Sequence, residues 1–217
     1  MLSVSRVREL LAPFSINLSD CQVEQLLAYN ALLLHWNKKI NLTAIDDPEE
    51  SVTRHFGESF FLSTIVKLSG RLLDVGSGAG FPGMALKLLC PSLEISLLEP
   101  IAKKRAFLKE VAKACEFGLV EVVGKTLDEF ISEARRNPND FLTIRAVGNL
   151  KRLLPQAVQS LNADGHLCLW VGMDQIPEIQ GVGLQIEWKQ PVQIPLSCRR
   201  QIFVGRISPQ ATAREDC

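Results

Sequence analysis

The segment that most constrains this chain is an apolar run that leads directly into a glycine-rich turn. Arg71–Val75 predicts a buried parallel strand, and Gly-Ser-Gly-Ala-Gly-Phe-Pro-Gly follows it at 76–83. A helix is expected at Gly80–Leu89. Open α/β sheets bind ligands at the carboxyl ends of their strands, where glycines let the backbone turn sharply and approach the ligand. The segment therefore predicts a nucleotide-type site, with a plain tight connection as the alternative.

Strands and helices alternate along the rest of the chain at a regular pitch. This alternation predicts an α/β fold with a Rossmann-like, doubly wound sheet that is mostly parallel. The further expected elements are strands at Glu94–Leu98, Val120–Val123, Phe141–Ile144 and Gly165–Val171 and helices at Lys103–Cys115, Leu127–Arg135 and Asn149–Leu161. Two late strands, Leu184–Trp188 and Gln201–Gly205, are close enough in sequence to form an antiparallel pair at one edge.

The chain ahead of this alternation is expected to be helical. We predict an N-terminal helical segment at residues 1–68, a sheet domain at 69–207 and a flexible tail at 208–217. Ser19 and Asp20 can cap a helix that runs toward Trp36, and Pro48 suits the first position of a second helix. A polar loop, Asn37–Ile45, is expected between the two helices.

The spacing of the glycines separates two classes of nucleotide ligand. A dinucleotide-binding turn has a third glycine where this chain has Phe81, and Gly83 comes too late to replace it. Asp74 precedes the first glycine and suits a ligand with a cationic amino-acid end rather than a diphosphate. S-adenosylmethionine has such an end and no phosphate. We expect Asp74, Gly76 and Gly78 to hold it, and Phe81 to pack on its adenine, wall the methyl channel or belong to the core.

Two further carboxylates are placed to contact the nucleoside part of such a ligand. Glu99 ends the second strand, roughly twenty residues beyond the glycine turn, where a carboxylate can accept both ribose hydroxyls. Enzymes that bind NAD use the same device, and a solvated strand end is the alternative. Asp128 begins the helix after the third strand, where it can accept from the adenine amino group or only cap the helix.

Charge and cysteine content exclude several classes of protein. Lys plus Arg and Asp plus Glu both total 24, so any nucleic-acid role must rest on a local basic patch. The six cysteines form no Cys-x-x-Cys pair and have no histidine at ligand spacing, so no metal is expected. Scattered cysteines, no signal peptide and no long apolar run indicate a cytoplasmic protein without a membrane partner, which we expect to be a monomer.

Five elements of the sequence resemble one family. They are Trp-Asn-Lys-Lys-Ile-Asn-Leu-Thr-Ala-Ile at 36–45, Arg-His-Phe-Gly-Glu-Ser at 54–59, the glycine turn with its Phe-Pro-Gly ending at 74–83, Lys-Lys-Arg-Ala-Phe-Leu at 103–108 and Ile-Arg-Ala-Val at 144–147. The family is that of the bacterial methyltransferases of guanine N7 in small-subunit ribosomal RNA, once called glucose-inhibited division protein B. The resemblance covers most of the chain.

The resemblance implies a class I S-adenosylmethionine-dependent methyltransferase with an added N-terminal helical segment. Its substrate would be a guanine in 16S rRNA, free or in the small ribosomal subunit, and a small molecule or a protein is the alternative substrate. In such enzymes the cofactor is contacted by residues that match Gly76, Phe81, Leu127, Asp128 and Arg145. An NAD-binding oxidoreductase or a non-catalytic nucleotide-binding module is disfavoured by Phe81 and Asp74.

Three positions depart from the family pattern. Glu58 stands where the family usually has Asp, which changes the reach of that carboxylate by one methylene. Thr126 stands where an Arg often precedes the Leu-Asp pair at 127–128, and Trp-Val-Gly at 170–172 lacks a Lys that often precedes its Gly. If the missing cations contact RNA in relatives, this chain must hold its RNA with other residues.

Methylation of guanine N7 needs alignment rather than a general base, because the attacking nitrogen carries no proton. Arg145 is the leading catalytic candidate: it can bond guanine O6, stack on the base or bind the cofactor carboxylate, and a surface arginine is the alternative. His55, Glu58 and Ser59 share one face of a regular helix. They are expected either to line the site, where the carboxylate can accept from the guanine edge, or to form a packing face.

The expected RNA contacts are basic or polar residues near these elements. Cations bind phosphates, but runs of charge are more often only solvated, and this alternative remains open for each cluster. Cations in the first turn of a helix oppose its dipole, which hints at a use. The predicted contacts are Lys38, Asn41, Arg54, Lys103, Lys104 and Arg105.

Overall fold

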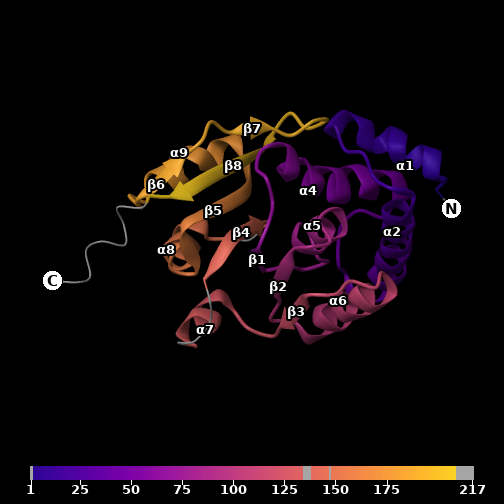
Figure 1. Cartoon of the computed structure of the whole chain (residues 1–217), viewed down its shortest axis with the longest axis horizontal. Helices are drawn as coiled ribbons and strands as arrows, with labels where there is room; N and C mark the ends of the chain where they lie inside the picture. The colour runs from indigo at the N-terminus through magenta and orange to yellow at the C-terminus, as the bar shows by residue number, and fades with distance from the viewer. Residues whose placement is uncertain (1, 134–137, 147, 209–217) are drawn as a thin grey trace.

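The computed structural model describes residues 2–133, 138–146 and 148–208 (Figure 1). Its strands are β1 Arg71–Val75, β2 Glu94–Leu98, β3 Val120–Val123, β4 Asn139–Arg145, β5 Leu161–Gly172, β6 Ile186–Trp188, β7 Val192–Gln193 and β8 Arg200–Ile207. Within the described residues these strands form one sheet in the order β3-β2-β1-β4-β5-β8-β6, and β7 also pairs with β8. The pairs among β1 to β5 are parallel, and those of β8 are antiparallel. The predicted mostly parallel sheet with an antiparallel edge is confirmed.

Helices cover both faces of this sheet. The longer ones are α1 Val4–Leu11, α2 Asp20–Ile40, α5 Gly83–Leu89, α6 Ala102–Ala114, α7 Leu127–Ser132, α8 Leu150–Gln159 and α9 Ile176–Gln180. In Figure 1, α2, α5 and α6 lie on one side of the sheet and α7 and α8 on the other. No described helix is both long and apolar enough to cross a membrane, and the described residues contain no group of three or more potential metal ligands.

The two expected helix starts in the N-terminal segment are confirmed. Ser19 caps α2 in a capping box with Gln22, and Asp47 caps α3 (Pro48–Ser51) with Pro48 at its first position. The chain then continues through a π-helical turn, Val52–Gly57, into α4 (Glu58–Phe60) and a 3-10 turn, Phe61–Thr64. The expected polar loop is shorter than predicted, because α2 runs through Asn37 and ends only at Ile40.

The helical segment and the sheet share one hydrophobic core. A single cluster of buried side chains runs from Val7 in α1 to Val204 in β8 and includes the buried face of α2. Trp36 packs against this cluster, with its ring 5.9 Å from that of Phe107 on α6, as expected of a residue at the junction. A second cluster lies on the opposite face, under α7, α8 and α9. The predicted boundary at residue 68 is therefore not a gap in the core, and it stays a prediction.

Some predicted bounds differ from the observed ones. Helix α5 begins at Gly83 rather than Gly80, because the glycine loop takes up the intervening residues, and β5 begins at Leu161 rather than Gly165. The predicted end of α7 near residue 135 lies outside the described residues, as do Val147 and the predicted tail beyond Ser208.

Candidate active site

The glycine-rich loop between β1 and α5 is anchored to the neighbouring strand. Gly76, Gly78 and Gly80 have φ angles of 70°, 56° and 90°, in the left-handed region that favours glycine. The amides of Gly76 and Ser77 donate to the carbonyl oxygen of Leu98 in β2, at 2.9 and 3.0 Å. A Cβ at Gly78 would meet only Gly76 O, at 3.8 Å, so the backbone here leaves space that a ligand can approach.

A cavity of about 330 Å³ lies against this loop, at the carboxyl ends of β1 and β4. Its volume falls within the range of about 300–1,000 Å³ that small-molecule sites usually have. The N-terminal segment, the start of α6 and the end of β4 complete its walls. The lining residues are Leu42, Thr43, His55, Gly76, Ser77, Gly78, Ala79, Phe81, Lys104, Arg145 and Ala146.

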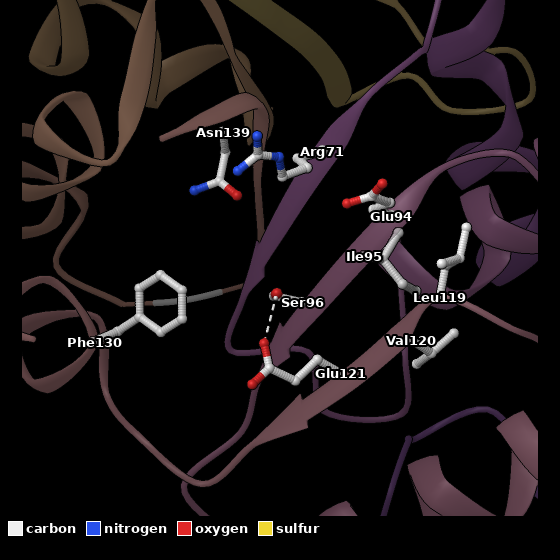
Figure 2. A pocket seen from close by; sticks show the side chains of 9 residues that line it. All are labelled: Arg71, Glu94, Ile95, Ser96, Leu119, Val120, Glu121, Phe130 and Asn139. Carbon is white, nitrogen blue, oxygen red and sulfur yellow. Dashed lines mark hydrogen bonds between the residues drawn. The ribbon is translucent and has the colours of Figure 1, made fainter. Parts of the chain in front are cut away.

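A second hollow, of about 360 Å³, lies at the amino ends of the strands (Figure 2). Its lining mixes charges of both signs, from Arg71, Glu94 and Glu121, with the amide of Asn139. Ser96 Oγ donates to Glu121 there, at 3.2 Å. Because ligands of parallel α/β sheets bind at the carboxyl ends, we assign the nucleotide site to the cavity at the glycine loop.

Asp74 lies beneath the loop and is 1% exposed. Its Oδ1 accepts from Thr143 Oγ1 at 2.7 Å, whereas its buried Oδ2 has no hydrogen-bond partner among the described residues. Burial raises the pKa of Asp74 to about 6, against the opposing effect of the hydrogen bond from Thr143. The carboxylate does not line the cavity, so its direct contact with a ligand ammonium stays a prediction.

Glu99 is 4% exposed at the end of β2, so the alternative of a solvated strand end is wrong. Its Oε2 accepts from the amide of Gly78 at 2.9 Å, and its Oε1 accepts from the amide of Ile101 at 2.8 Å. The carboxylate thus holds the glycine loop against the start of α6. Each carboxylate oxygen can accept a further hydrogen bond, so the predicted ribose contact is compatible with this arrangement.

The alternative that Asp128 caps α7 is wrong, because Thr126 is the cap. The Thr126 hydroxyl accepts from the amide of Glu129, and the Glu129 carboxylate accepts from the amide of Thr126. Asp128 lies in the first turn, about half exposed and 3.6 Å from Arg152. Leu127 is buried in the core. Neither Leu127 nor Asp128 lines the cavity, and their cofactor contacts stay predictions.

Stacked rings form part of the cavity wall. His55 stacks on Phe81, with ring centroids 4.7 Å apart and planes inclined by 15°. Tyr29 of α2 also stacks on Phe81, at 5.3 Å and 4°. Phe81 is 8% exposed, so it belongs to the core and to the cavity wall at once.

His55 is a neutral group in this site. Its Nε2 lies 2.8 Å from Thr43 Oγ1, and its Nδ1 is buried without a partner among the described residues. Burial lowers the pKa of His55 to about 3, and the charges of Arg145, Arg54 and Arg200 act in the same direction. The imidazole therefore adds no positive charge to the cavity at neutral pH.

Arg145 ends β4 with its guanidinium bound to the N-terminal segment. Its Nη2 donates to Arg54 O at 2.7 Å and to Glu58 Oε2 at 3.1 Å. Its Nη1 donates to Ser59 Oγ and His55 O at 3.4 and 3.5 Å. The side chain is 14% exposed, so the alternative of an ordinary surface arginine is wrong. Burial lowers the pKa of Arg145 to about 10, and the group stays charged at neutral pH.

The three residues predicted to share a helix face are divided between the cavity and the core. His55 belongs to the π-helical turn and lines the cavity, whereas Glu58 and Ser59 are 2% and 0% exposed. Both Glu58 oxygens are in ion pairs, one with Arg145 and one with Arg200. This arrangement argues against the predicted contact of Glu58 with a guanine edge, and it favours the packing alternative for Glu58 and Ser59.

The predicted RNA contacts of the N-terminal segment lie at the end of α2 and in the π-helical turn. Asn41 ends α2 with φ 47°, a conformation that asparagine tolerates better than most residues. Lys38, in the last turn of α2, is exposed. Arg54 is paired with Glu50 at 2.8 Å. These positions are compatible with RNA contacts, which stay predictions.

The basic start of α6 has three different roles. Lys103 is exposed, as in the solvated alternative, whereas Lys104 lines the cavity. Arg105 Nη1 donates to the carbonyl oxygens of Glu99 and Pro100, at 3.0 and 2.6 Å. Arg105 therefore straps the end of β2 to α6, and the solvated alternative is wrong for it.

Several residues of the site were not predicted. Tyr29 hydrogen-bonds the glycine loop, Thr143 holds Asp74, and Ala146 lines the cavity with φ 55°. A signal existed for Tyr29, which is the only tyrosine of the chain and stands in the apolar stripe of α2. A buried hydroxyl usually needs an acceptor. A signal also existed for Ala146, which stands beside Arg145 in the Ile-Arg-Ala-Val element. The contact of Thr143 with Asp74 depends on the pairing of β4 with β1, which the residues next to Thr143 in sequence do not indicate.

A family model described as GidB, rRNA small subunit methyltransferase G, matches residues 22–199. The chain belongs to this family. It is 33% identical to the ribosomal RNA small subunit methyltransferase G of Alkaliphilus oremlandii, over 84% of this chain and 81% of that protein. It is 36% identical to the protein of the same name from Xylella fastidiosa strain 9a5c, over 88% of this chain and 90% of that protein.

Solved structures agree with this family in fold. A putative O-methyltransferase from Klebsiella pneumoniae has a TM-score of 0.63 at 14% identity and covers 83% of this chain and 90% of its own. A SAM-dependent methyltransferase from Aquifex aeolicus has a TM-score of 0.59 at 15% identity and covers 77% of this chain and 97% of its own. The predicted class I fold is confirmed by these structures, and the predicted methyltransferase is confirmed by the family.

Proposed function

We propose that this chain transfers the methyl group of S-adenosylmethionine to N7 of a guanine in 16S ribosomal RNA. The observation that carries the proposal is the shared cavity, which the glycine loop, Arg145 and the N-terminal His55 and Thr43 line together. The loop offers a surface for the cofactor. The N-terminal segment, an addition to the sheet, offers a second surface on which a substrate base can be held.

The glycine loop fits S-adenosylmethionine in three respects. The backbone at Gly78 is open to a ligand, and Glu99 holds a carboxylate beside it. Asp74 keeps an unpaired carboxylate oxygen beneath the loop, as suits a cationic ligand. When bound, the cofactor supplies an electrophilic methyl group on its sulfonium. The residues proposed to hold it are Asp74, Gly76, Gly78, Phe81, Glu99, Leu127, Asp128 and Arg145.

The side chains around the cavity suit a nucleophile without a proton. Guanine N7 offers a lone pair in the major groove, so the site needs alignment and no general base. His55 is neutral and Arg145 is charged at neutral pH. The proposed role of Arg145 is to orient the base or the cofactor from the cavity wall. Glu58 and Ser59 are proposed to act through Arg145, since both contact it.

The proposed RNA surface consists of the polar residues that flank the cavity on two sides. Leu42 and Thr43, next to Asn41, line the cavity, as does Lys104 of α6. Contacts between lysine or arginine side chains and phosphates make the affinity for RNA depend on salt concentration. The slope of log affinity against log salt concentration should fall in magnitude by about one for each such contact removed. The residues proposed to contact RNA are Lys38, Asn41, Arg54, Lys103, Lys104 and, through its strap, Arg105.

Methyl transfer to small subunits, naked 16S rRNA and free guanosine, followed by mapping of the modified base, tests this proposal. N7-methylguanosine is expected in the RNA and only when the methyl donor is present. Arg145→Ala is expected to lower the rate about 100-fold or more, because misplacement near the reacting atoms has effects of this size. Arg206→Ala, which removes an exposed arginine paired with Asp164, is the matched control. Methylation of a small molecule or a protein instead of RNA would refute the proposal that 16S rRNA is the substrate.

Calorimetry with S-adenosylhomocysteine and with NAD tests the ligand class independently of turnover. S-adenosylhomocysteine is expected to bind and NAD is not. The reverse result would refute the hypothesis that the cavity binds the cofactor of a methyltransferase. A monomer and a cytoplasmic location are also proposed. The five described cysteines are free thiols, which supports a reducing compartment.

A further inference from the structure

Glu58 is a buried carboxylate that ties together distant segments of the chain. Its Oε2 lies 3.1 Å from Arg145 Nη2 at the end of β4, and its Oε1 lies 2.6 Å from Arg200 Nη2 at the start of β8. Its backbone oxygen accepts a hydrogen bond from Trp170 Nε1 on β5, at 2.9 Å. The N-terminal segment is thereby bound to three strands of the sheet beside the cavity wall.

The place of Arg145 in that wall depends on this carboxylate. Among the described residues that accept from its guanidinium, Glu58 is the charged one, whereas the backbone oxygens of Arg54 and His55 and the hydroxyl of Ser59 are neutral. Hydrogen bonds between two charged groups are roughly twice as strong as those between neutral groups. A displaced Glu58 carboxylate would therefore release Arg145 from its strongest contact.

Arg200 is the second partner of the carboxylate. Glu58 is 2% exposed, so water cannot replace a lost partner, and an unpaired buried charge is strongly unfavourable. The Arg200 side chain is 33% exposed, and its short contact with Oε1 leaves Oε2 to Arg145. The preceding residue, Arg199, is exposed, and the described residues hold no ion pair of it.

We propose that Arg200 is a positioning residue of the methyl-transfer site, which holds the Glu58 carboxylate so that Arg145 keeps its place in the cavity wall. This inference rests on the proposed function, because it concerns the same cavity. It differs from a role of Arg200 as a surface contact for an RNA phosphate. A positioning residue acts on kcat, whereas a phosphate contact acts on KM and on the salt dependence.

The positioning role of Arg200 can be tested in the pH–rate profile, because the positive charges that face Glu58 affect the protonation of its carboxylate. They are Arg145 from β4, Arg200 from β8 and Arg54 from the preceding turn. Burial raises the pKa of Glu58, and these three arginines oppose the rise. Loss of Arg200 removes one opposing charge, so the carboxylate takes up a proton at a higher pH. The acidic limb of the pH–rate profile should then move to higher pH.

The test compares Arg200→Gln with Arg199→Gln, which removes the same charge from the exposed neighbour. Arg200→Gln is expected to lower kcat about tenfold at pH 7, to change KM for RNA less than about threefold and to shift the acidic limb upward. Arg200→Lys, which keeps the charge, should restore most of the rate and the original limb. An unchanged kcat in Arg200→Gln, or a change in KM alone, would overturn the proposal.

A second readout does not depend on turnover. At pH 8, Arg200→Gln is expected to raise the unfolding equilibrium constant about tenfold, because it leaves the buried Glu58 charge with Arg145 alone as its ion-pair partner. In a Glu58→Gln background the same change should have little effect, since no charge remains. Equal effects in the two backgrounds would refute the pairing. If Arg200 and Glu58 are coupled in stability but the protein methylates no RNA, the proposed function would be refuted and the pairing of the two residues would stand.

Discussion

The hydroxyl of Tyr29 donates a hydrogen bond to the carbonyl oxygen of Ala79, at 2.5 Å. Tyr29 belongs to α2 in the N-terminal segment, and Ala79 lies in the middle of the glycine loop. The same ring stacks on Phe81 at 5.3 Å. The added helical segment therefore supports the cofactor loop directly, so a change in the segment is expected to reach the cofactor without touching it.

Tyr29→Phe tests this support. The variant keeps the stacked ring but leaves the Ala79 carbonyl without its donor, a loss of roughly 1 kcal/mol for a hydrogen bond of this kind. We expect S-adenosylhomocysteine to bind about five- to tenfold more weakly, as measured by calorimetry, because the loop is less well held. Trp36→Phe changes a partly buried ring of the same core without a loop contact. It should lower stability and leave affinity unchanged, and equal losses of affinity in both variants would contradict the role of Tyr29.

Alanine substitutions at Gly80 and Gly183 distinguish the cost of a left-handed backbone from the cost of steric crowding. A Cβ at Gly80 would lie 2.2 Å from Tyr29 Oη and 2.9 Å from Met84 Cβ, whereas one at Gly183 would meet nothing within 4 Å. Both positions have positive φ, 90° and 71°, which costs an alanine roughly 1–2 kcal/mol. Urea denaturation should therefore show the backbone cost alone for Gly183→Ala, and a further ~1–3 kcal/mol from overpacking for Gly80→Ala. Equal destabilisation would contradict the observed packing of the loop.

The sheet could be predicted from the sequence because its information is local. An apolar run such as Arg71–Val75, followed by a turn and a helix, repeats along the chain, and right-handed crossovers restrict the order of parallel strands. Helix starts were equally local, since Ser19 and Pro48 act on the next few residues. The end of α2 was missed because polar residues such as Lys39 are as compatible with an exposed helical turn as with a loop.

The site was harder to predict, because its geometry depends on contacts between distant residues. Gly76, Gly78 and Phe81 line the cavity and Asp74 does not, and regular helical spacing could not reveal the π-helical turn that separates His55 from Glu58. Burial decides the state of a carboxylate, and nothing beside Glu58 in sequence indicates that Arg200 lies against it. The direction of Arg145 likewise depends on acceptors some 90 positions away.

The imidazole of His55 should stay neutral across the working range of the enzyme. Its pKa is lowered to about 3 by burial and by the surrounding arginines, so no titration is expected between pH 5 and 8. An unfolded histidine takes up a proton near pH 6.5, so the contribution of His55 to stability is lost as the pH falls from about 6.5 toward 3. Imidazole signals in NMR titrations, assigned with His55→Asn, measure this directly. A midpoint above pH 5 would contradict the buried, cation-flanked environment.

Asp74 should affect stability in the opposite direction. Its pKa is raised from 3.8 to about 6, so the folded protein takes up this proton at a higher pH than the unfolded chain. The contribution of Asp74 to the free energy of unfolding is therefore lowest above pH 6, where the carboxylate is ionised in the folded and the unfolded chain. This contribution rises as the pH falls toward 4. Asp74→Asn removes the buried charge and can still accept from Thr143. It should raise the unfolding free energy at pH 8 by up to ~3 kcal/mol, and this gain should fade near pH 4.

The same variant should bind the cofactor less well, because a cationic ligand loses the buried negative charge beneath the loop. We expect about a tenfold weaker affinity for S-adenosylmethionine in Asp74→Asn at pH 8, measured by calorimetry alongside urea denaturation. Asp164→Asn, at an exposed residue away from the cavity, is the control and should change both quantities little. A variant that gains stability and keeps full affinity would show that Asp74 supports only the fold. One that loses both would contradict the raised pKa, because the ionised carboxylate would then stabilise the fold rather than weaken it.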